Sequence, residues 1–243
     1  MREQSRPGHQ SAGRPTQFEP AGITRLVVAP HADDEVFGCG GLLAKHHEDA
    51  AVVVLAALDS LREAEFSAAQ EILGYPTAYF LDLPDGSIGA DMHTLVGQLD
   101  RVLDRCRPRE LYLPYPSIHQ DHIAAYEAGM RAARLSMTPG HWFPPNVYVY
   151  DVACYDLVLY PTELRWNIFE TLSEEHVDLK VKAAMAYGSQ AVTGPHPIND
   201  LKQCAATLGA ARRVDWAEQF ALVRSVRDHD MQDLRESRAG VLR

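Results

Sequence analysis

Histidine and carboxylate side chains gather at two points of the chain, and each cluster directly follows an apolar, strand-like run. The first cluster is Pro30-His31-Ala32-Asp33-Asp34-Glu35, and the second is Ser117-Ile118-His119-Gln120-Asp121-His122. Imidazole nitrogens and carboxylate oxygens are common ligands of divalent zinc in proteins. The two clusters therefore predict a metal centre, provided that the fold brings them together.

The strands and helices predicted around the clusters indicate that the fold brings the two clusters together. From Ile23 onward, short β-branched runs alternate with stretches of helical spacing, which is typical of an α/β fold with a mostly parallel sheet and helices on both faces. We predict strands at 23–29, 51–58, 77–83, 110–115 and 147–152. In the common strand order 3-2-1-4-5, strands one and four are neighbours where the order reverses. Both clusters then lie in one crevice beyond the carboxyl ends of these strands.

Helices are predicted between the strands and after them. Ser60 followed by Glu63 predicts a capping box at the start of the helix after the second strand, and Gly74 ends that helix. His46 and His47 are predicted on the surface of the first helix. Further helices are expected at 93–106, 121–135, 175–188 and 200–226.

The sequence is predicted to divide into an N-terminal arm, one domain and a C-terminal tail. Residues 1–22 lack the apolar segment of a signal peptide and are predicted to form a flexible arm. Residues 23–229 are predicted to form a single domain, and the charged stretch 230–243 a frayed tail.

Composition excludes several classes of partner. The 243 residues carry a net charge of -10, which repels nucleic acid and anionic lipid. The longest apolar run, 50–58, is far shorter than the ~18 residues of a membrane span. The four cysteines form no C-x-x-C pair, so we expect reduced thiols and a cytoplasmic protein. They are Cys39, Cys106, Cys154 and Cys204.

The chemistry of a hydrolytic centre with a divalent metal divides the two clusters into ligands and spare groups. Such a centre holds three protein ligands and leaves one position for water, and His31, Asp34 and His122 satisfy that count. Asp33 remains as a carboxylate that accepts a proton, and His119 as a donor to an oxyanion. These spare groups favour catalysis over a structural metal site.

A purely structural interpretation stays open for each cluster. Asp33 or Asp34 would then cap the helix after the first strand. In the second cluster, Asp121 would be the helix cap, while His119 and His122 would lie at the surface. This interpretation does not explain why both clusters follow the two strands expected at the switch point.

Other motif-based functions fit less well. The turn after the first strand has no G-x-G-x-x-G, and its carboxylates would repel a pyrophosphate. Neither a P-loop motif nor a G-x-S-x-G nucleophile elbow occurs. Two histidines and a carboxylate also hold non-haem iron, but an oxygenase would leave Asp33 without a role.

The two clusters resemble the signatures of the LmbE-like (PIG-L) family of zinc-dependent N-deacetylases, (P/A)-H-x-D-D-E and H-x-D-H. Weaker similarities follow in family order between residues 28 and 190. They are Gly38-Cys39-Gly40-Gly41, Arg62-Glu63-Ala64-Glu65, Leu73-Gly74, Leu83-Pro84-Asp85-Gly86 and Tyr187-Gly188-Ser189-Gln190. The resemblance implies a Rossmann-like fold, catalytic Zn²⁺ and hydrolysis of an N-acetyl group, typically on a glucosamine unit.

Carried onto this chain, the resemblance makes His31, Asp34 and His122 the zinc ligands. It makes Asp33 the general base and His119 the residue that stabilises the oxyanion. The chain departs from the family at Ala32, where proline is common, and in its short loop before Arg62. Loop length near a pocket mouth affects substrate choice, so the specificity of the relatives does not transfer.

Residues near the same edge of the sheet are candidates for substrate binding. Arg62 would hold sugar hydroxyls or a phosphate, or would pair with Asp59, Glu63 or Glu65 instead. Asp85 would accept a sugar hydroxyl, or would only form a turn in Pro84-Asp85-Gly86.

Two further side chains have weaker assignments. Asp121 would orient His119 by contacting it from behind the metal centre, unless it only caps its helix. His196 would cover the pocket, although a lone loop histidine is usually just solvated.

The sequence therefore predicts an N-deacetylase that acts on a small N-acetyl amino sugar or glycoconjugate. One alternative is an amidase that removes a larger acyl group from a glucosaminyl thiol conjugate. A second alternative is a metal-binding module without turnover, in which Asp33 and His119 would be dispensable.

Overall fold

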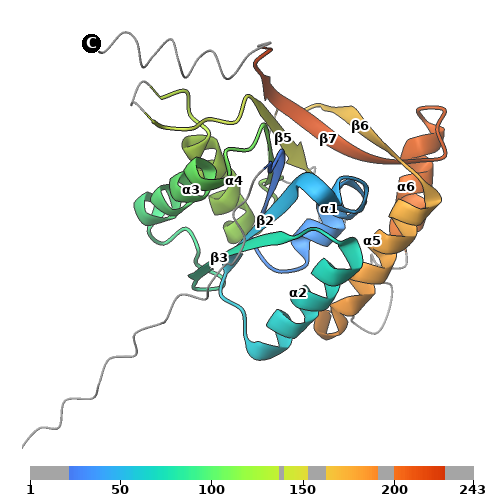
Figure 1. Cartoon of the computed structure of the whole chain (residues 1–243), viewed down its shortest axis with the longest axis horizontal. Coiled ribbons are helices and arrows are strands. Elements are labelled where there is room, and N and C mark those ends of the chain that lie inside the picture. The colour runs from blue at the N-terminus through green and yellow to red at the C-terminus, as the bar shows by residue number, and fades with distance from the viewer. Residues whose placement is uncertain (1–21, 137–139, 153–162, 191–199, 228–243) are drawn as a thin grey trace, which may run out of the picture.

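Apolar strands form the central sheet of the protein. The computed structural model describes residues 22–136, 140–152, 163–190 and 200–227 (Figure 1). The sheet has the order β3-β2-β1-β4-β5-β7-β6. The strands are β1 (Arg25–Ala29), β2 (Ala50–Ala56), β3 (Thr77–Leu83), β4 (Glu110–Pro114), β5 (Asn146–Tyr150), β6 (Trp166–Leu172) and β7 (Trp216–Ser225).

The first five strands are parallel and have the predicted order 3-2-1-4-5. β7 then runs antiparallel to β5, and β6 runs antiparallel to β7. Every residue of β2 is buried, as a central parallel strand requires. The predicted α/β fold class is thus confirmed, with two strands added at one edge.

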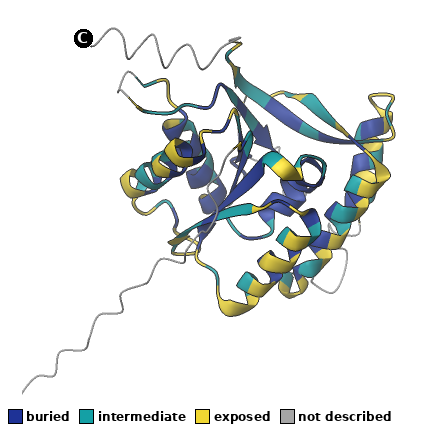
Figure 2. Cartoon of the chain, viewed as in Figure 1, coloured by how far each residue is buried: buried dark blue, intermediate teal, exposed yellow. Residues whose placement is uncertain are grey.

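Helices cover both faces of the sheet (Figure 1). They are α1 (Asp34–Lys45), α2 (Ser60–Leu73), α3 (Met92–Cys106), α4 (Gln120–Ala132), α5 (Glu174–Ala186) and α6 (Leu201–Ala210), with 3-10 turns η1 (His47–Asp49) and η3 (Gly188–Gln190). α3 and α4 bury their apolar residues in one core cluster, whereas α1, α2 and α5 share the other. Figure 2 shows the buried sheet and the exposed outer faces of α2 and α5.

The predicted helix over 200–226 is wrong in its second half. α6 ends at Ala210, and β7 follows, where its residues pair with β5 and β6. Gly209 permits the sharp return, because a Cβ there would lie 2.6 Å from the carbonyl oxygen of Asp215. Strand pairing with distant residues outweighs the local helical pattern.

The start of α2 also differs from the prediction. Asp59, not Ser60, is the N-cap, and its carboxylate accepts a hydrogen bond of 2.8 Å from the backbone N–H of Arg62. Gly74 ends α2 as expected, with a left-handed φ of 84°. The first helix ends at Lys45, so His46 and His47 follow it, and His46 lies 3.1 Å from Glu170 of β6.

Several predictions concern residues that the structure does not describe. The arm at 1–22, apart from Gly22, and the tail at 230–243 lie outside the described ranges, as do Cys154 and His196. Cys39, Cys106 and Cys204 are free thiols. Among the described residues, no helix has the length and apolar character needed to cross a membrane.

A buried ion pair joins α1, α5 and β7. The Glu218 carboxylate accepts hydrogen bonds from the backbone N–H groups of Gly41 (2.8 Å) and Leu42 (2.7 Å), and from Lys180 Nζ at 2.7 Å. Glu218 and Lys180 are 4% and 6% exposed. Burial of both charges makes each dependent on the other.

We expect Glu218→Ala to lower the free energy of unfolding by about 3 kcal/mol or more, because it leaves the Lys180 charge buried without its partner. Urea denaturation measures the change. Arg131→Ala is the control, since it breaks an exposed pair with Glu127 and should barely move the midpoint. Equal effects of the two variants would contradict this prediction.

Candidate metal centre

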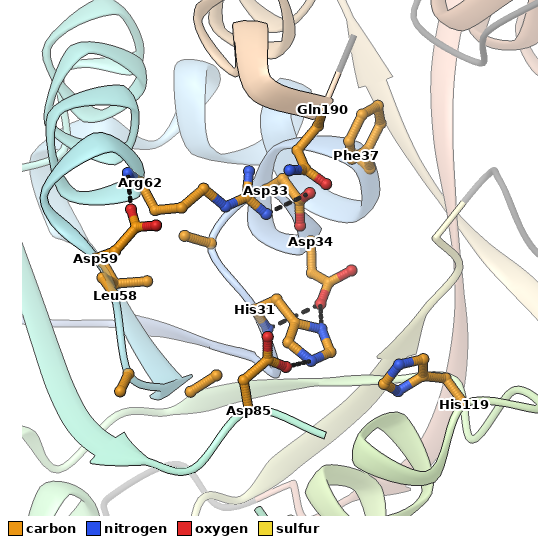
Figure 3. Close-up of a pocket in the computed structure, with 13 residues that line it drawn as sticks. His31, Asp33, Asp34, Phe37, Leu58, Asp59, Arg62, Asp85, His119 and Gln190 are labelled. Atoms are coloured by element: carbon orange, nitrogen blue, oxygen red, sulfur yellow. Dashed lines mark hydrogen bonds and ion pairs between the residues drawn. The ribbon is translucent and has the colours of Figure 1, made fainter. Parts of the chain in front are cut away.

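The two histidine and carboxylate clusters meet at the carboxyl edge of the sheet. β1 and β4 are parallel neighbours, so the turns that follow them lie side by side. The β1–α1 turn supplies His31, the start of α1 supplies Asp34, and the start of α4 supplies His122. One potential ligand atom from each of these residues lies within 4.8 Å of those of the other two. Figure 3 shows His31 and Asp34 from this group.

The spacing of these three residues fits a tetrahedral zinc ion. Asp34 Oδ2 lies 3.3 Å from His31 Nδ1 and 3.4 Å from His122 Nε2. Two ligand atoms about 2.1 Å from a tetrahedral zinc are roughly 3.4 Å apart. The donor set, two imidazoles and one carboxylate, is also one that zinc accepts in catalytic sites. The residues present therefore fit the metal that the family resemblance implies.

The surroundings of Asp34 favour its negatively charged form. Burial opposes this charge, but His122 and His31 outweigh it and hold the pKa of the Asp34 carboxyl well below its usual range. The backbone N–H of His31 also donates to Asp34 Oδ2 at 3.0 Å. The carboxylate is therefore deprotonated and fixed in place, as a metal ligand must be.

The second ring nitrogen of His31 faces carboxylates. His31 Nε2 lies 3.1 Å from Asp121 Oδ2 and 3.3 Å from Asp85 Oδ1. The buried Asp121 carboxylate also accepts the backbone N–H groups of Gly86 (2.8 Å) and Ile88 (3.2 Å). A carboxylate on the far nitrogen of a ligating histidine orients the ring and raises its basicity.

Asp121 therefore positions a different histidine from the one predicted. Its carboxylate contacts His31, whereas only its backbone N–H reaches His119, at Nδ1 and 3.2 Å. The cap of α4 is likewise His119 and not Asp121. Burial opposes a charge on His31, but Asp34 and Asp121 outweigh it and raise the pKa of His31 to about 9.

Asp33 lies beside the three candidate ligand residues in a strained backbone conformation. Its φ is 133°, a region that residues with a Cβ rarely adopt. Its carboxylate accepts a hydrogen bond of 3.2 Å from Arg62 Nη2. Burial, followed by the charge of Asp34, raises the pKa of Asp33 to about 8, and Arg62 opposes this rise. A carboxyl group with a pKa near neutrality suits proton transfer.

The Glu35 carboxylate stabilises the turn that contains Asp33. Its Oε2 accepts the backbone N–H of Asp33 at 2.9 Å, and its Oε1 accepts the hydroxyl of Tyr187 at 2.5 Å. The side chain is fully buried, and burial raises the pKa of Glu35 to about 7. Since both carboxylate oxygens are engaged inside the protein, Glu35 is not a second base for the cleft.

His119 is arranged as a neutral hydrogen-bond donor. Burial and the charges of His31 and His122 lower the pKa of His119. Its Nδ1 accepts the backbone N–H of Asp121, so in the neutral ring the proton is on Nε2. His119 can therefore donate a hydrogen bond in its neutral form, because the Nε2–H group needs no added proton.

The candidate site opens into a cleft of about 400 Å³ (Figure 3). Its lining includes both substrate-binding candidates, Arg62 and Asp85. Arg62 pairs with Asp33 and lies 3.6 Å from Glu65, so one of its predicted ion-pair partners is found. The Asp85 side chain is 74% exposed beside His31. The full lining is His31, Ala32, Asp33, Asp34, Phe37, Ala56, Ala57, Leu58, Asp59, Arg62, Asp85, His119 and Gln190.

Sequence reasoning gave no role to the turn after α5. Glu65 accepts the backbone N–H and the hydroxyl of Ser189, each at 2.6 Å, and this turn places Gln190 in the cleft lining. The Arg62 guanidinium lies 5.5 Å from the centre of the Tyr187 ring. The weak family similarities at 62–65 and 187–190 were the available signal, but only the fold shows that they touch.

Comparison with known proteins agrees with this geometry. The family PIG-L, described as GlcNAc-PI de-N-acetylase, matches residues 26–133, which include both clusters. The "Uncharacterized deacetylase YaiS" of Escherichia coli (strain K12) is 26% identical over 179 residues, covering 68% of this chain and 90% of that protein.

Solved structures share the fold. The conserved protein TT1542 from Thermus thermophilus is 27% identical, with a TM-score of 0.71, over 86% of this chain and 99% of that one. N,N'-diacetylchitobiose deacetylase from Pyrococcus horikoshii is 19% identical, with a TM-score of 0.65, over 87% and 88%.

The same fold also occurs in GalB, the 4-carboxy-2-hydroxymuconate hydratase of Pseudomonas putida KT2440, at 24% identity and a TM-score of 0.66 over 86% of this chain and 100% of that one. The fold alone does not fix the reaction. The family match over residues 26–133 includes both signature clusters, and it confirms that this part of the chain resembles the PIG-L (LmbE-like) family.

Proposed function

We propose that this chain is a zinc-dependent hydrolase that removes the N-acetyl group from an N-acetylglucosaminyl-containing small molecule, releasing acetate and a free amine. The observation that carries the proposal is the triangle of His31, Asp34 and His122, of which His31 and Asp34 line a cleft together with Asp33. We also propose that residues 23–229 form one catalytic domain and that it acts in the cytoplasm.

The proposed roles follow from the contacts of each side chain. His31 Nδ1, Asp34 Oδ2 and His122 Nε2 would hold the metal. Zinc, when bound, lowers the pKa of a water molecule to roughly 7 and polarises a carbonyl group. Asp33 takes the proton from the attacking water and returns it to the leaving amine. The Nε2–H of His119 donates to the carbonyl oxygen as it becomes negative.

Arg62 and Asp85 are the proposed sugar contacts. We expect Arg62→Ala to raise KM by about tenfold, the effect of losing one hydrogen bond to a charged group. Because Arg62 also pairs with Asp33, kcat should fall as well. Steady-state kinetics separate the two parameters, and Arg62→Lys, which keeps the charge, should recover part of the loss. An unchanged KM in Arg62→Ala would remove Arg62 from the sugar site.

The charge of the protein predicts a further preference. With a net charge of -10 and Asp59 and Asp85 in the cleft lining, a neutral glycoside should react faster than an acidic polymer. Rates on an N-acetylglucosaminyl small molecule and on N-acetylated polyanions at low ionic strength test this. Faster turnover of the polyanion would contradict it.

The deciding experiment is a panel of N-acetylglucosaminyl compounds with detection of new primary amines. The proposed function requires amine release by the zinc-loaded protein and its loss after treatment with a chelator. Amine release only from compounds with larger acyl groups would favour the amidase alternative. Stable metal binding with no turnover of any compound would favour the metal-binding module.

A further inference from the structure

We propose that Phe37 limits the length of the acyl group that the site accepts, and that a second cavity behind it would hold a longer acyl chain. This inference rests on the proposed function. Phe37 lines the metal cleft, and it also lines a separate cavity of about 330 Å³. It is thus a residue that both spaces share.

The second cavity suits an apolar occupant. It lies between α1, α5, α6 and β7, and aliphatic side chains contribute to its lining beside polar ones. Its aliphatic residues are Leu201, Ala205, Leu208 and Ala217. Three charged residues also line it: Lys180 and Glu218, which bond to each other at 2.7 Å, and Asp151, which follows β5. A hydrocarbon chain placed there would leave this ion pair intact.

The positions of the polar side chains in the cleft indicate how the sugar and acyl parts of the substrate are oriented. Figure 3 shows Arg62 and Asp59 on one side of the Asp33 carboxylate and Phe37 on the other. In an amide, the amine and acyl parts extend in opposite directions from the carbonyl carbon. If the sugar contacts Arg62 and Asp85, the acyl group points toward Phe37.

The Phe37 side chain lies between the metal cleft and the second cavity. It lies one helical turn after Asp33 on α1, and it is 5% exposed. Figure 3 shows its ring on the side of Asp33 away from Arg62, where the acyl group would be. Removal of the ring should join the cleft to the second cavity. Each methylene that then enters the cavity should favour the longer acyl group by about fourfold, which corresponds to ~0.8 kcal/mol.

The test compares kcat/KM for N-acetylglucosamine and N-butyrylglucosamine, with detection of the released amine. For the wild type we expect a strong preference for the acetyl compound. Phe37→Ala should raise the butyryl-to-acetyl ratio by about 15-fold, the product of two methylenes. Phe37→Leu, a smaller change that is easier to accommodate, should shift the ratio in the same direction by less.

Phe66→Ala is the matched control. Phe66 is 1% exposed in the same core cluster as Phe37 but lines neither cavity, so its loss should destabilise the fold and leave the ratio unchanged. Folded Phe37 variants with the wild-type ratio would overturn the inference, as would an equal shift in Phe66→Ala. Absence of amine release from every compound would instead refute the proposed function.

Discussion

Asp33→Asn should lower kcat by on the order of 10²- to 10⁴-fold, the usual contribution of a positioned general base. The replacement keeps the size of the side chain and removes its basicity, while the three ligand residues remain. The zinc content should therefore stay near one ion per chain. Elemental analysis and amine-release kinetics on the same preparation measure both quantities.

Asp82→Asn is a control for the backbone at Asp33. Asp82 also has a positive φ, of 51°, but it is exposed and absent from the cleft lining. This variant should keep full activity. An active Asp33→Asn enzyme would move the base elsewhere, and His119 would be next, because both oxygens of Glu35 are bonded inside the protein.

Variants that lose a proposed metal ligand should differ from Asp33→Asn in their zinc content. His122→Ala and Asp34→Asn should release the metal and abolish turnover, because each removes one corner of the donor triangle. His119→Ala should keep the metal and lose only turnover. Zinc content after dialysis distinguishes the two classes of variant.

Two outcomes would revise the ligand assignment. If His119→Ala strips the metal while His122→Ala keeps it, the two histidines have exchanged roles. If Asp33→Asn and Asp34→Asn lose metal equally, the two carboxylates share the site. A metal-free preparation with full activity would refute the centre itself.

The parts of this protein that follow from local sequence were predictable. The apolar runs indicated the first five strands, and the strand order placed His31 and His122 at neighbouring strand ends. Two imidazoles and a carboxylate at such a position indicate a metal. This inference needs only the residue types and the direction of the strands.

The errors arise where distant residues decide the outcome. The stretch 216–225 has helical spacing, but pairing with β5 makes it a strand. Asp121 is two residues from His119 in sequence, yet its carboxylate contacts His31, 90 residues away. Glu65 and Ser189 are 124 residues apart. Spacing along the chain carries no information about such contacts.

Tyr187 supports the Asp33 turn through its hydrogen bond to Glu35, and this affects the order in which the site forms. The family match ends at residue 133, and all three proposed ligands precede that point, whereas the phenol that bonds Glu35 comes from the turn after α5. During synthesis, the ligands emerge from the ribosome well before Tyr187. A nascent chain can therefore bring its proposed metal-binding groups together while the backbone of Asp33, the proposed base, is still free to relax. Docking of α5 against α1 and α2 then becomes the step that completes the proposed site.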